Sequence, residues 1–343
     1  MMESDASRGR TRILITGGSG FVGLALAQSL LERGVQVRLF DRRPPPAAFL
    51  SAIQALKGNL QILQGDVCTD ADVREACAGG ITHVFHGAAI TAGPEREVAQ
   101  TLQIIEVNVQ GALRVLRAAA DAGVKRFVYP SSLTVYGEAV HGASPLTESG
   151  TPPAPDTLYG ITKYAAECAV LRLGQLIGLP VCVGRIGSVF GPWEGETGAR
   201  DMVSPFAQIA AAAARGEPVV LPGQYPSREM IYAPDLSAGL TALLFATRPA
   251  HPYYNLSANF DWDGALIRWC ETLAACLPDF NWRYAEAGYP STISFHGARP
   301  RVSMNASRAR GDLGFRPSFA RDDALKHYAD WVAGHTEFFA HRA

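Results

Sequence analysis

The stretch Arg12-Ile13-Leu14-Ile15-Thr16-Gly17-Gly18-Ser19-Gly20-Phe21-Val22-Gly23 joins a short apolar run to a glycine-rich loop near the start of the chain. The apolar run predicts a buried strand, and the pattern from Leu24 to Leu31 predicts a helix that ends at Gly34. A second strand is predicted from Val35 to Phe40, and Asp41 follows it directly. Strand, glycine loop, helix, strand and acid follow one another in the order of a dinucleotide-binding βαβ unit.

The glycine loop and the acid indicate which dinucleotide is bound. Gly17 and Gly20 let the backbone approach a pyrophosphate, which the free N–H groups and the dipole of the helix N-terminus then hold. Asp41 is expected to accept hydrogen bonds from the adenosine ribose, and its charge would repel a 2′-phosphate. NAD is therefore predicted rather than NADP. Arg42 and Arg43 leave the alternative open, because either could pair with such a phosphate or simply be solvated.

Further apolar runs predict the rest of a sheet. Strands are expected over residues 60–63, 84–86, 127–129 and 181–186. A long helix is expected from Glu97 to Ala120, and another starts at Tyr159 and stops near Gly178. This alternation predicts an α/β fold, a Rossmann-type doubly wound parallel sheet.

The character of the chain changes after Gly191-Pro192, where no regular strand–helix repeat continues. We expect an NAD-binding domain over residues 11–191, rejoined by parts of 228–257 that include a strand at 253–256. Residues 192–343 are expected to form mainly a smaller C-terminal substrate-binding lobe.

Tyr159-Gly160-Ile161-Thr162-Lys163 carries a candidate acid–base pair at the start of its helix. Four residues make just over one helical turn, so Tyr159 and Lys163 emerge on the same face. A nearby ammonium favours the phenolate, and we expect it to lower the pKa of the phenol. Such a pair can exchange a proton with an alcohol or a carbonyl. The spacing is common in ordinary helices, so the interpretation depends on the dinucleotide motif that accompanies it.

Composition limits the partners. A net charge of -1, 48% hydrophobic residues and 18% charged residues are typical of a soluble globular chain and argue against nucleic acid or a membrane surface as a partner. No apolar run reaches the length of a membrane span. The six cysteines show no Cys-x-x-Cys and no metal-type pairing with histidines, so we expect no metal, no disulfide and a cytoplasmic location.

With these residues assembled, the chain resembles the extended short-chain dehydrogenase/reductase superfamily, in particular the NAD-dependent epimerase/dehydratase family. The resemblance covers nearly the whole length. It rests on Thr16 to Gly23, Gly65-Asp66-Val67, His86-Gly87-Ala88-Ala89, Ser131 to Gly137, Tyr159-x-x-x-Lys163 and Val189-Phe190-Gly191-Pro192.

The resemblance implies a role for each matching residue. Ser132 would bind the reacting oxygen, Tyr159 would be the acid–base group, and Lys163 would hold the nicotinamide ribose. The residues expected to bind the cofactor are Gly17, Gly20, Phe21, Val22, Asp41, Arg42, Asp66, Val67, Ala88, Asn108, Tyr159, Lys163 and Val189. Those expected to bind substrate are Ser132, Thr134, Arg228 and Arg299. Relatives often form homodimers through a four-helix bundle, here the helices at 97–120 and 159–176.

Some positions depart from the family pattern. Leu133-Thr134 replaces the Asp-Glu of the 4,6-dehydratases, which argues against dehydration. The register of Arg299 and Arg301, where relatives clamp a nucleotide diphosphate, is open. So is the segment after Pro192, which matches no nucleotide-sugar pattern.

We therefore expect an NAD-dependent oxidoreductase or epimerase acting on a secondary alcohol of a small-molecule substrate: a sugar, sugar acid or nucleotide sugar. The alternatives are a dehydrogenase or ketoreductase of a non-carbohydrate hydroxy compound, and an NAD-binding regulatory protein without turnover.

Overall fold

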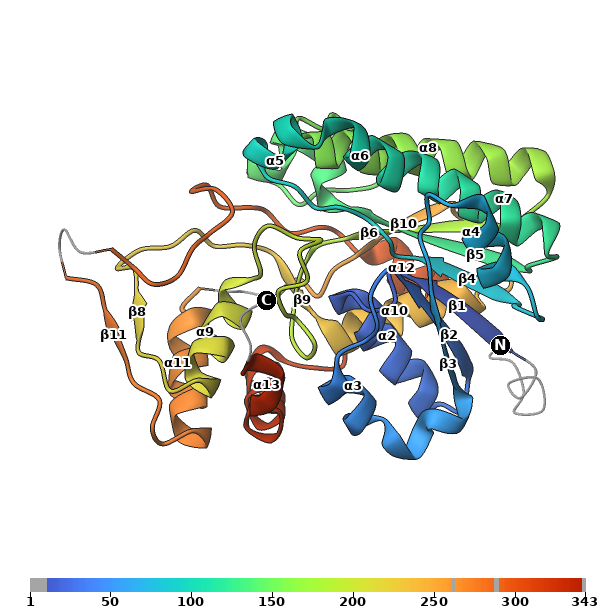
Figure 1. The fold of residues 1–343 in the computed structure, drawn as a ribbon. Helices are drawn as coiled ribbons and strands as arrows, with labels where there is room; N and C mark the ends of the chain where they lie inside the picture. Colours follow the sequence, from blue (N-terminus) through green and yellow to red (C-terminus); the bar gives the residue numbers. More distant parts are fainter. Residues whose placement is uncertain (1–10, 261–262, 287–289, 341–343) are drawn as a thin grey trace.

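A seven-stranded parallel sheet forms the centre of the computed structural model, which describes residues 11–260, 263–286 and 290–340 (Figure 1). The strands lie in the order β10-β6-β5-β4-β1-β2-β3. Their bounds are β1 Arg12–Thr16, β2 Gln36–Asp41, β3 Leu60–Gln64, β4 His83–His86, β5 Arg126–Ser132, β6 Val181–Ile186 and β10 Tyr253–Leu256. The predicted fold class is confirmed, and the strand expected at 253–256 pairs in parallel with β6.

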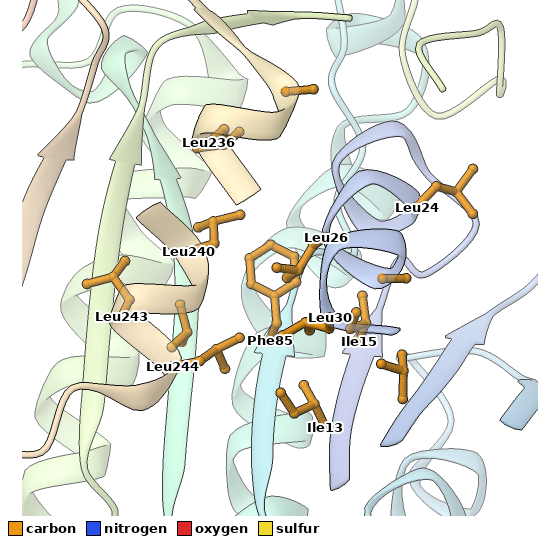
Figure 2. Close-up of a cluster of buried hydrophobic side chains, with 14 of the residues drawn as sticks. Ile13, Ile15, Leu24, Leu26, Leu30, Phe85, Leu236, Leu240, Leu243 and Leu244 are labelled. Atoms are coloured by element: carbon orange, nitrogen blue, oxygen red, sulfur yellow. The ribbon is translucent and has the colours of Figure 1, made fainter. Parts of the chain in front are cut away.

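Alternating residues of the strands supply two hydrophobic cores, one on each face of the sheet. Ile13 and Ile15 of β1 pack with α2 (Phe21–Glu32) and α10 (Ala233–Phe245), as Figure 2 shows. Leu14 points to the opposite face, which α4 (Asp70–Cys77), α7 (Ala112–Asp121) and α8 (Leu158–Ile177) cover. The smaller elements α3 (Ala47–Ala52) and η1 (Gln54–Asn59) connect β2 to β3.

The prediction of a single long helix from Glu97 to Ala120 is wrong. The chain forms α5 (Pro94–Ala99), α6 (Thr101–Ile105), a π-helical turn η2 (Glu106–Gly111) and then α7. Gln100 leaves helical geometry with φ −129° and ψ 27°, which separates α5 from α6. In the π turn the amide of Asn108 bonds the backbone of Ile90 and the hydroxyl of Thr162. The hydrophobic periodicity of the sequence does not distinguish a π-helical turn from a regular α-helix. Such turns often mark a functional region.

Helix α8 begins and ends where the sequence indicates. Thr157 caps its first turn, because its hydroxyl accepts from the N–H of Gly160 at 3.1 Å. Gly178 ends it with φ +75°, in the left-handed region that favours glycine. The N-terminus of α8 packs closely on η3 (Leu133–His141), since a Cβ at Gly160 would lie 2.8 Å from the carbonyl oxygen of Thr134. This contact brings α8 against the end of β5.

The remaining elements lie beside the sheet, and most of them build a third hydrophobic core. They are β7 (Ser188–Phe190) with β9 (Met230–Tyr232), β8 (Val219–Leu221) with β11 (Trp282–Tyr284), α9 (Pro205–Ala214), α11 (Ala265–Cys276), α12 (Ser307–Leu313), α13 (Arg321–Gly334) and η4 (Thr336–Phe339). Aromatic side chains fill this core, with Trp269 stacked on Tyr328 at 4.8 Å between ring centroids. The boundary predicted at residue 191 stays a prediction.

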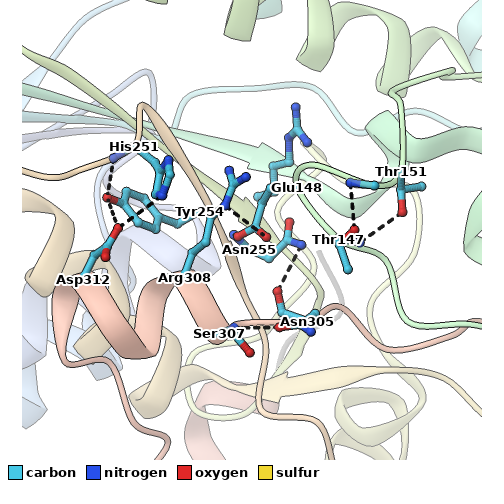
Figure 3. A network of polar contacts seen from close by, with 12 residues as sticks. Thr147, Glu148, Thr151, His251, Tyr254, Asn255, Asn305, Ser307, Arg308 and Asp312 are labelled. Atoms are coloured by element: carbon cyan, nitrogen blue, oxygen red, sulfur yellow. Dashed lines mark hydrogen bonds and ion pairs between the residues drawn. The ribbon is translucent and has the colours of Figure 1, made fainter.

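A polar network ties the chain after residue 301 to the edge of the sheet (Figure 3). The N–H of Asn255 donates to Glu148 at 2.9 Å, and the Asn255 amide donates to the carbonyl oxygen of Asn305 at 3.3 Å. Glu148 also lies 3.9 Å from Arg308, and Tyr254 donates to Asp312. Because Asn255 and Glu148 are buried, these bonds set the course of the segment that enters α12.

Among residues 11–260, 263–286 and 290–340, no helix has both the length and the apolar character needed to cross a bilayer. Over the same ranges, no three His, Cys, Asp or Glu side chains converge on a possible metal site. All six cysteines are free thiols.

The glycine loop yields a first prediction. A Cβ at Gly23 would overlap the carbonyl oxygen of Gly17, which is backbone and can move only by distorting the loop. We expect Gly23→Ala to lower the free energy of unfolding by about 1–3 kcal/mol, measured by urea denaturation.

Gly311 is a matched control, since it is exposed in α12 and a Cβ there meets nothing within 4 Å. Gly311→Ala should instead raise stability by about 0.5–1 kcal/mol. If both variants change stability in the same direction, the loop does not depend on the close approach at Gly23.

Candidate active site

Ser132, Tyr159 and Lys163 meet at the carboxyl edge of the sheet. Ser132 ends β5, and its hydroxyl oxygen accepts from the N–H and the hydroxyl of Thr134 at 3.2 and 3.0 Å. The phenol of Tyr159 hydrogen-bonds the Ser132 side chain. All four residues line one cavity of about 640 Å³. The structure therefore assembles the predicted set, at the edge where open parallel sheets bind ligands.

Lys163 is a buried ammonium that faces this cavity. Its side chain is almost enclosed, with Nζ 4.3 Å from the ring centroid of Tyr129. Burial lowers the pKa of Lys163 to about 7, while the charge of Glu167 acts in the opposite direction. Within the described residues Nζ has no hydrogen-bond acceptor, so hydroxyl groups such as those of a ribose would complete its coordination.

The expected lowering of the Tyr159 pKa is wrong for the protein as described. Burial raises the pKa of the phenol above its ordinary value, because the phenolate would be desolvated. A hydrogen bond with Thr91, the charge of Arg200 and the bond with Ser132 act against this shift. The cation that acts on the phenol is thus Arg200, which the chemistry of Tyr159 and Lys163 alone does not reveal.

Thr91 is a site residue that the sequence analysis missed. Its side chain hydrogen-bonds the Tyr159 phenol, and it lines the same cavity as Ser132. Thr91 lies five residues after the end of β4. This position near the carboxyl edge of the sheet is the one feature of the sequence that could have indicated Thr91 as a site residue. Beneath it, His86 is fully buried with Nδ1 2.8 Å from the Thr16 hydroxyl. Burial and the charge of Lys163 lower the pKa of His86 to about 3, so this imidazole is neutral at neutral pH.

A second cavity of about 380 Å³ lies on the other side of the glycine loop. It is lined by the predicted cofactor residues Gly17, Gly20, Asp41, Arg42, Asp66, Val67 and Ala88, whereas Phe21, Val22 and Val189 line the larger cavity. Asp41 accepts from the N–H groups of Ser19 and Arg43 at 3.1 and 3.2 Å, and Arg42 lies 4.0 Å from Asp66.

These residues fit a dinucleotide. Gly17 has φ +65°, and a Cβ there would lie 2.7 Å from the backbone nitrogen of Ala88, so only glycine leaves the loop this open. Bound NAD would have the carboxylates of Asp41 and Asp66 at its adenosine end and Lys163 at its nicotinamide end.

Asn108 makes structural contacts, which do not support its predicted cofactor role. Its Oδ1 accepts from the N–H of Ile90 at 2.7 Å, and its Nδ2 donates to the Ile90 carbonyl oxygen and the Thr162 hydroxyl, both at 3.0 Å. The amide is therefore used by the protein itself, and Asn108 is not among the residues that line either of these two cavities. It holds the loop after β4 against α8.

The far end of the larger cavity is cationic. Arg228 donates to the carbonyl oxygens of His296 and Gly297, but the Nε atoms of Arg228 and Arg301 are buried without partners among the described residues. Burial and the charge of Arg301 lower the pKa of Arg228 to about 10. Arg299 instead pairs with Glu138 at the exposed rim of the cavity. Of the two arginines with uncertain register, Arg301 is thus the one whose charge acts directly on Arg228.

Part of the lining of this cavity is apolar. It consists of Phe206, Tyr225, Met230, Ala265, Leu266 and Phe295. Among the described lining residues, Glu97 is the one carboxylate, and it accepts from the N–H of Tyr159 at 3.3 Å.

A parallel Rossmann-type sheet with this site defines an NAD-dependent enzyme of the extended short-chain dehydrogenase/reductase type. The chain belongs to the NAD dependent epimerase/dehydratase family, whose model matches residues 13–256. NAD is therefore the cofactor, and an NAD-binding protein without turnover is no longer an alternative.

Similar proteins act on different substrates. A 3 beta-hydroxysteroid dehydrogenase/Delta 5-->4-isomerase of Mycobacterium tuberculosis is 30% identical, over 92% of this chain and 88% of its own. A dTDP-D-glucose 4,6-dehydratase of Homo sapiens is 25% identical, over 93% and 89%. A UDP-glucose 4-epimerase of Thermus thermophilus, solved in complex with NAD, has a TM-score of 0.74 and 25% identity, over 94% of this chain and 99% of its own.

Burial of Lys163 yields a prediction on stability and pH. In the folded protein the ammonium loses its proton near pH 7, whereas the ordinary value is 10.5. Below the lower value the folded state buries a charge, so the wild type should gain stability as the pH rises between these two values.

Lys163→Met has no charge to bury. We expect its free energy of unfolding to exceed that of the wild type by about 1–3 kcal/mol at about pH 6, and the difference to shrink at about pH 9. Urea denaturation at both pH values measures this. A difference that is the same at both would mean that the ammonium is not desolvated.

Proposed function

We propose that the enzyme oxidises a secondary alcohol of an anionic small molecule, a sugar acid or nucleotide sugar, through Ser132, Tyr159 and Lys163. The observation that carries the proposal is the hydrogen bond between the Tyr159 phenol and Ser132, in a cavity that also contains the unpaired guanidinium atoms of Arg228 and Arg301.

The chemistry follows from the site. NAD supplies a hydride acceptor at C4 of its nicotinamide. Ser132 and Tyr159 are placed to hold the alcohol oxygen, and the phenolate of Tyr159 takes the hydroxyl proton as the carbon loses its hydride. The hydrogen bond with Thr91, the charge of Arg200 and the hydrogen bond with Ser132 favour that phenolate, whereas burial makes it more basic. Return of the hydride to the other face of the ketone gives an epimer, whereas release of the ketone gives a dehydrogenase.

The anionic substrate is inferred from charge. Placing two guanidinium groups close together inside a cavity costs free energy, which a bound phosphate or carboxylate would offset through charge-assisted hydrogen bonds. Glu97, the one described carboxylate of the lining, is already used by the backbone of Tyr159.

A second candidate is a dehydrogenase of a neutral hydroxysteroid-like compound. It is supported by the 30% identical relative and by the apolar wall around Phe206 and Leu266. Such a substrate would bring no anion to Arg228 and Arg301, and the charge of Asp156 acts on Arg301 alone. Dehydration is not proposed, because Leu133 is buried and Thr134 donates to Ser132 where a dehydratase has an Asp-Glu pair.

The proposal is tested by incubating the enzyme with NAD and UDP-glucose, UDP-glucuronic acid, dTDP-glucose or a 3β-hydroxysteroid. NADH formation and the appearance of the epimer are measured. Tyr159→Phe should lower kcat by about 10²–10⁴-fold because it removes the proton acceptor. Tyr164→Phe is the matched control, because Tyr164 lies in the same helix but does not line the cavity. Turnover that survives Tyr159→Phe would disprove the acid–base role.

The same assay separates the two candidates. Arg228→Gln should raise KM for a phosphorylated substrate by about tenfold, equivalent to about 1.4 kcal/mol, and leave a hydroxysteroid unaffected. Activity on the hydroxysteroid alone would support the second candidate.

We further propose that the enzyme is a homodimer through α5, α6 and α8. Val98 and Leu102 are largely exposed, with Ile161 of α8 also on the surface. Isolated apolar residues are common on surfaces, but here α6 packs against both α5 and α8, so the three helices that carry these residues are neighbours (Figure 1). The cytoplasmic location expected from the sequence stays a prediction.

Leu102→Glu should convert the dimer into a monomer in light scattering, because it places a charge among these apolar residues. Ile62→Glu, at an exposed position in β3 at the edge of the sheet, should leave the dimer intact. A wild-type protein that is monomeric at micromolar concentration would refute the proposal.

A further inference from the structure

Residues 195–201, here called the strap, lie between β7 and α9 and cross the cofactor groove. At one end they join the loop after β4. The N–H of Thr91 donates to the Ala199 carbonyl oxygen at 2.8 Å, and the N–H of Asp201 donates to the Thr91 carbonyl oxygen at 3.3 Å. Thr91 also hydrogen-bonds the Tyr159 phenol, so the strap is attached directly to the site.

An anchor of charged groups reinforces this end. The carboxylate of Asp201 accepts from the N–H of Gly93 at 2.6 Å and pairs with Arg96 at 2.9 Å. Arg96 also donates to the carbonyl oxygen of Gly198 at 2.9 Å. The pKa of Asp201 lies below its ordinary value because these bonds outweigh desolvation, so the anchor stays charged at neutral pH.

At the other end the strap reaches the loop after β2. A Cβ at Gly198 would lie 3.7 Å from the guanidinium of Arg43. In the sheet, β1 lies between β4 and β2. The strap therefore spans the carboxyl end of β1, where the glycine loop begins. Thr197 and Ala199 line both the larger and the smaller cavity, together with Gly17 and Gly20, so the groove continues beneath the strap.

Arg200 points from the strap toward the start of α2. Its Cζ lies 6.0 Å from the ring centroid of Phe21, the first residue of that helix, and it lines the larger cavity. Within the described part of the chain, its one ion pair is a 3.4 Å contact with the buried carboxylate of Glu194, which Ser204 also holds through two hydrogen bonds. The guanidinium is thus only partly satisfied, at the helix N-terminus where a dinucleotide diphosphate binds.

We propose that the strap closes over bound NAD, that Arg200 pairs with its diphosphate, and that the cofactor exchanges only when the anchor between Asp201 and Arg96 opens. This inference depends on NAD binding alone and is independent of the substrate. Opening the strap would also move Thr91 relative to Tyr159, which couples cofactor exchange to the alignment of the phenol.

The anchor is tested by the rate at which NADH leaves the enzyme, followed by stopped-flow fluorescence. Asp201→Asn and Arg96→Gln should each release NADH about tenfold faster than the wild type, since a hydrogen bond to a charged group is lost. Glu95→Gln is the matched control, because it removes one charge from an exposed position beside Arg96. Unchanged release in both anchor variants, or equal acceleration in the control, would overturn the proposal. Thermal denaturation of each variant shows whether it is folded. If Asp201→Asn does not fold, Arg96→Gln alone tests the anchor.

The role of Arg200 is tested by calorimetric binding to Arg200→Gln. Its affinity for NAD and for ADP-ribose should fall by a similar factor of about ten, while its affinity for adenosine is unchanged. Loss of NAD affinity with ADP-ribose binding intact would overturn the assignment to the diphosphate. Wild-type affinity for both would do the same.

Discussion

The close backbone approach between the glycine loop and the exit of β4 is the constraint on which the other features of the site depend. A side chain at Gly17 would meet the backbone of Ala88, and one at Gly23 would meet Gly17. Because neither has a side chain, α2 can start directly after the loop, and its first N–H groups have no acceptor inside the helix. The same closeness places the loop after β4, with Thr91, within reach of Tyr159.

Burial, more than pairwise charge, controls the titratable groups of the site. Desolvation is the largest cause of the raised pKa of Tyr159, the lowered pKa of Lys163 and the lowered pKa of His86. The site therefore holds a phenol that is hard to ionise beside an ammonium that is easily neutralised. Each shift reflects a desolvation free energy of a buried charge. Hydroxyl groups at Lys163 or an anion at Arg228 would offset that free energy when a ligand binds. Stability and function are opposed at these positions.

The larger cavity combines two chemical surfaces, which fits a family whose members act on substrates as different as steroids and nucleotide sugars. One end contains Ser132 and Tyr159, the proposed catalytic groups. The far end has an apolar wall and two arginines whose Nε atoms lack partners among the described residues. Much of this far end belongs to the region after β7, where few of the motifs that support the family resemblance occur.

The sequence by itself determined the sheet and the cofactor, and it indicated Ser132, Tyr159 and Lys163 as the candidate catalytic set, because these depend on short motifs whose geometry is local. The glycine loop follows a strand directly, and Tyr159 and Lys163 share a helical face through their spacing alone. The tertiary structure decided the rest. Asn108 serves the backbone of Ile90, and a π turn replaces a regular helix, because of contacts between loops distant in sequence. The charge of Arg301 lowers the pKa of Arg228, whereas Arg299 pairs with Glu138. The irregular segment that carries both arginines has no periodicity from which its path could be predicted. The pKa of Tyr159 is raised because burial outweighs the opposing effects of Thr91, Arg200 and Ser132, which only the packed chain brings near the phenol.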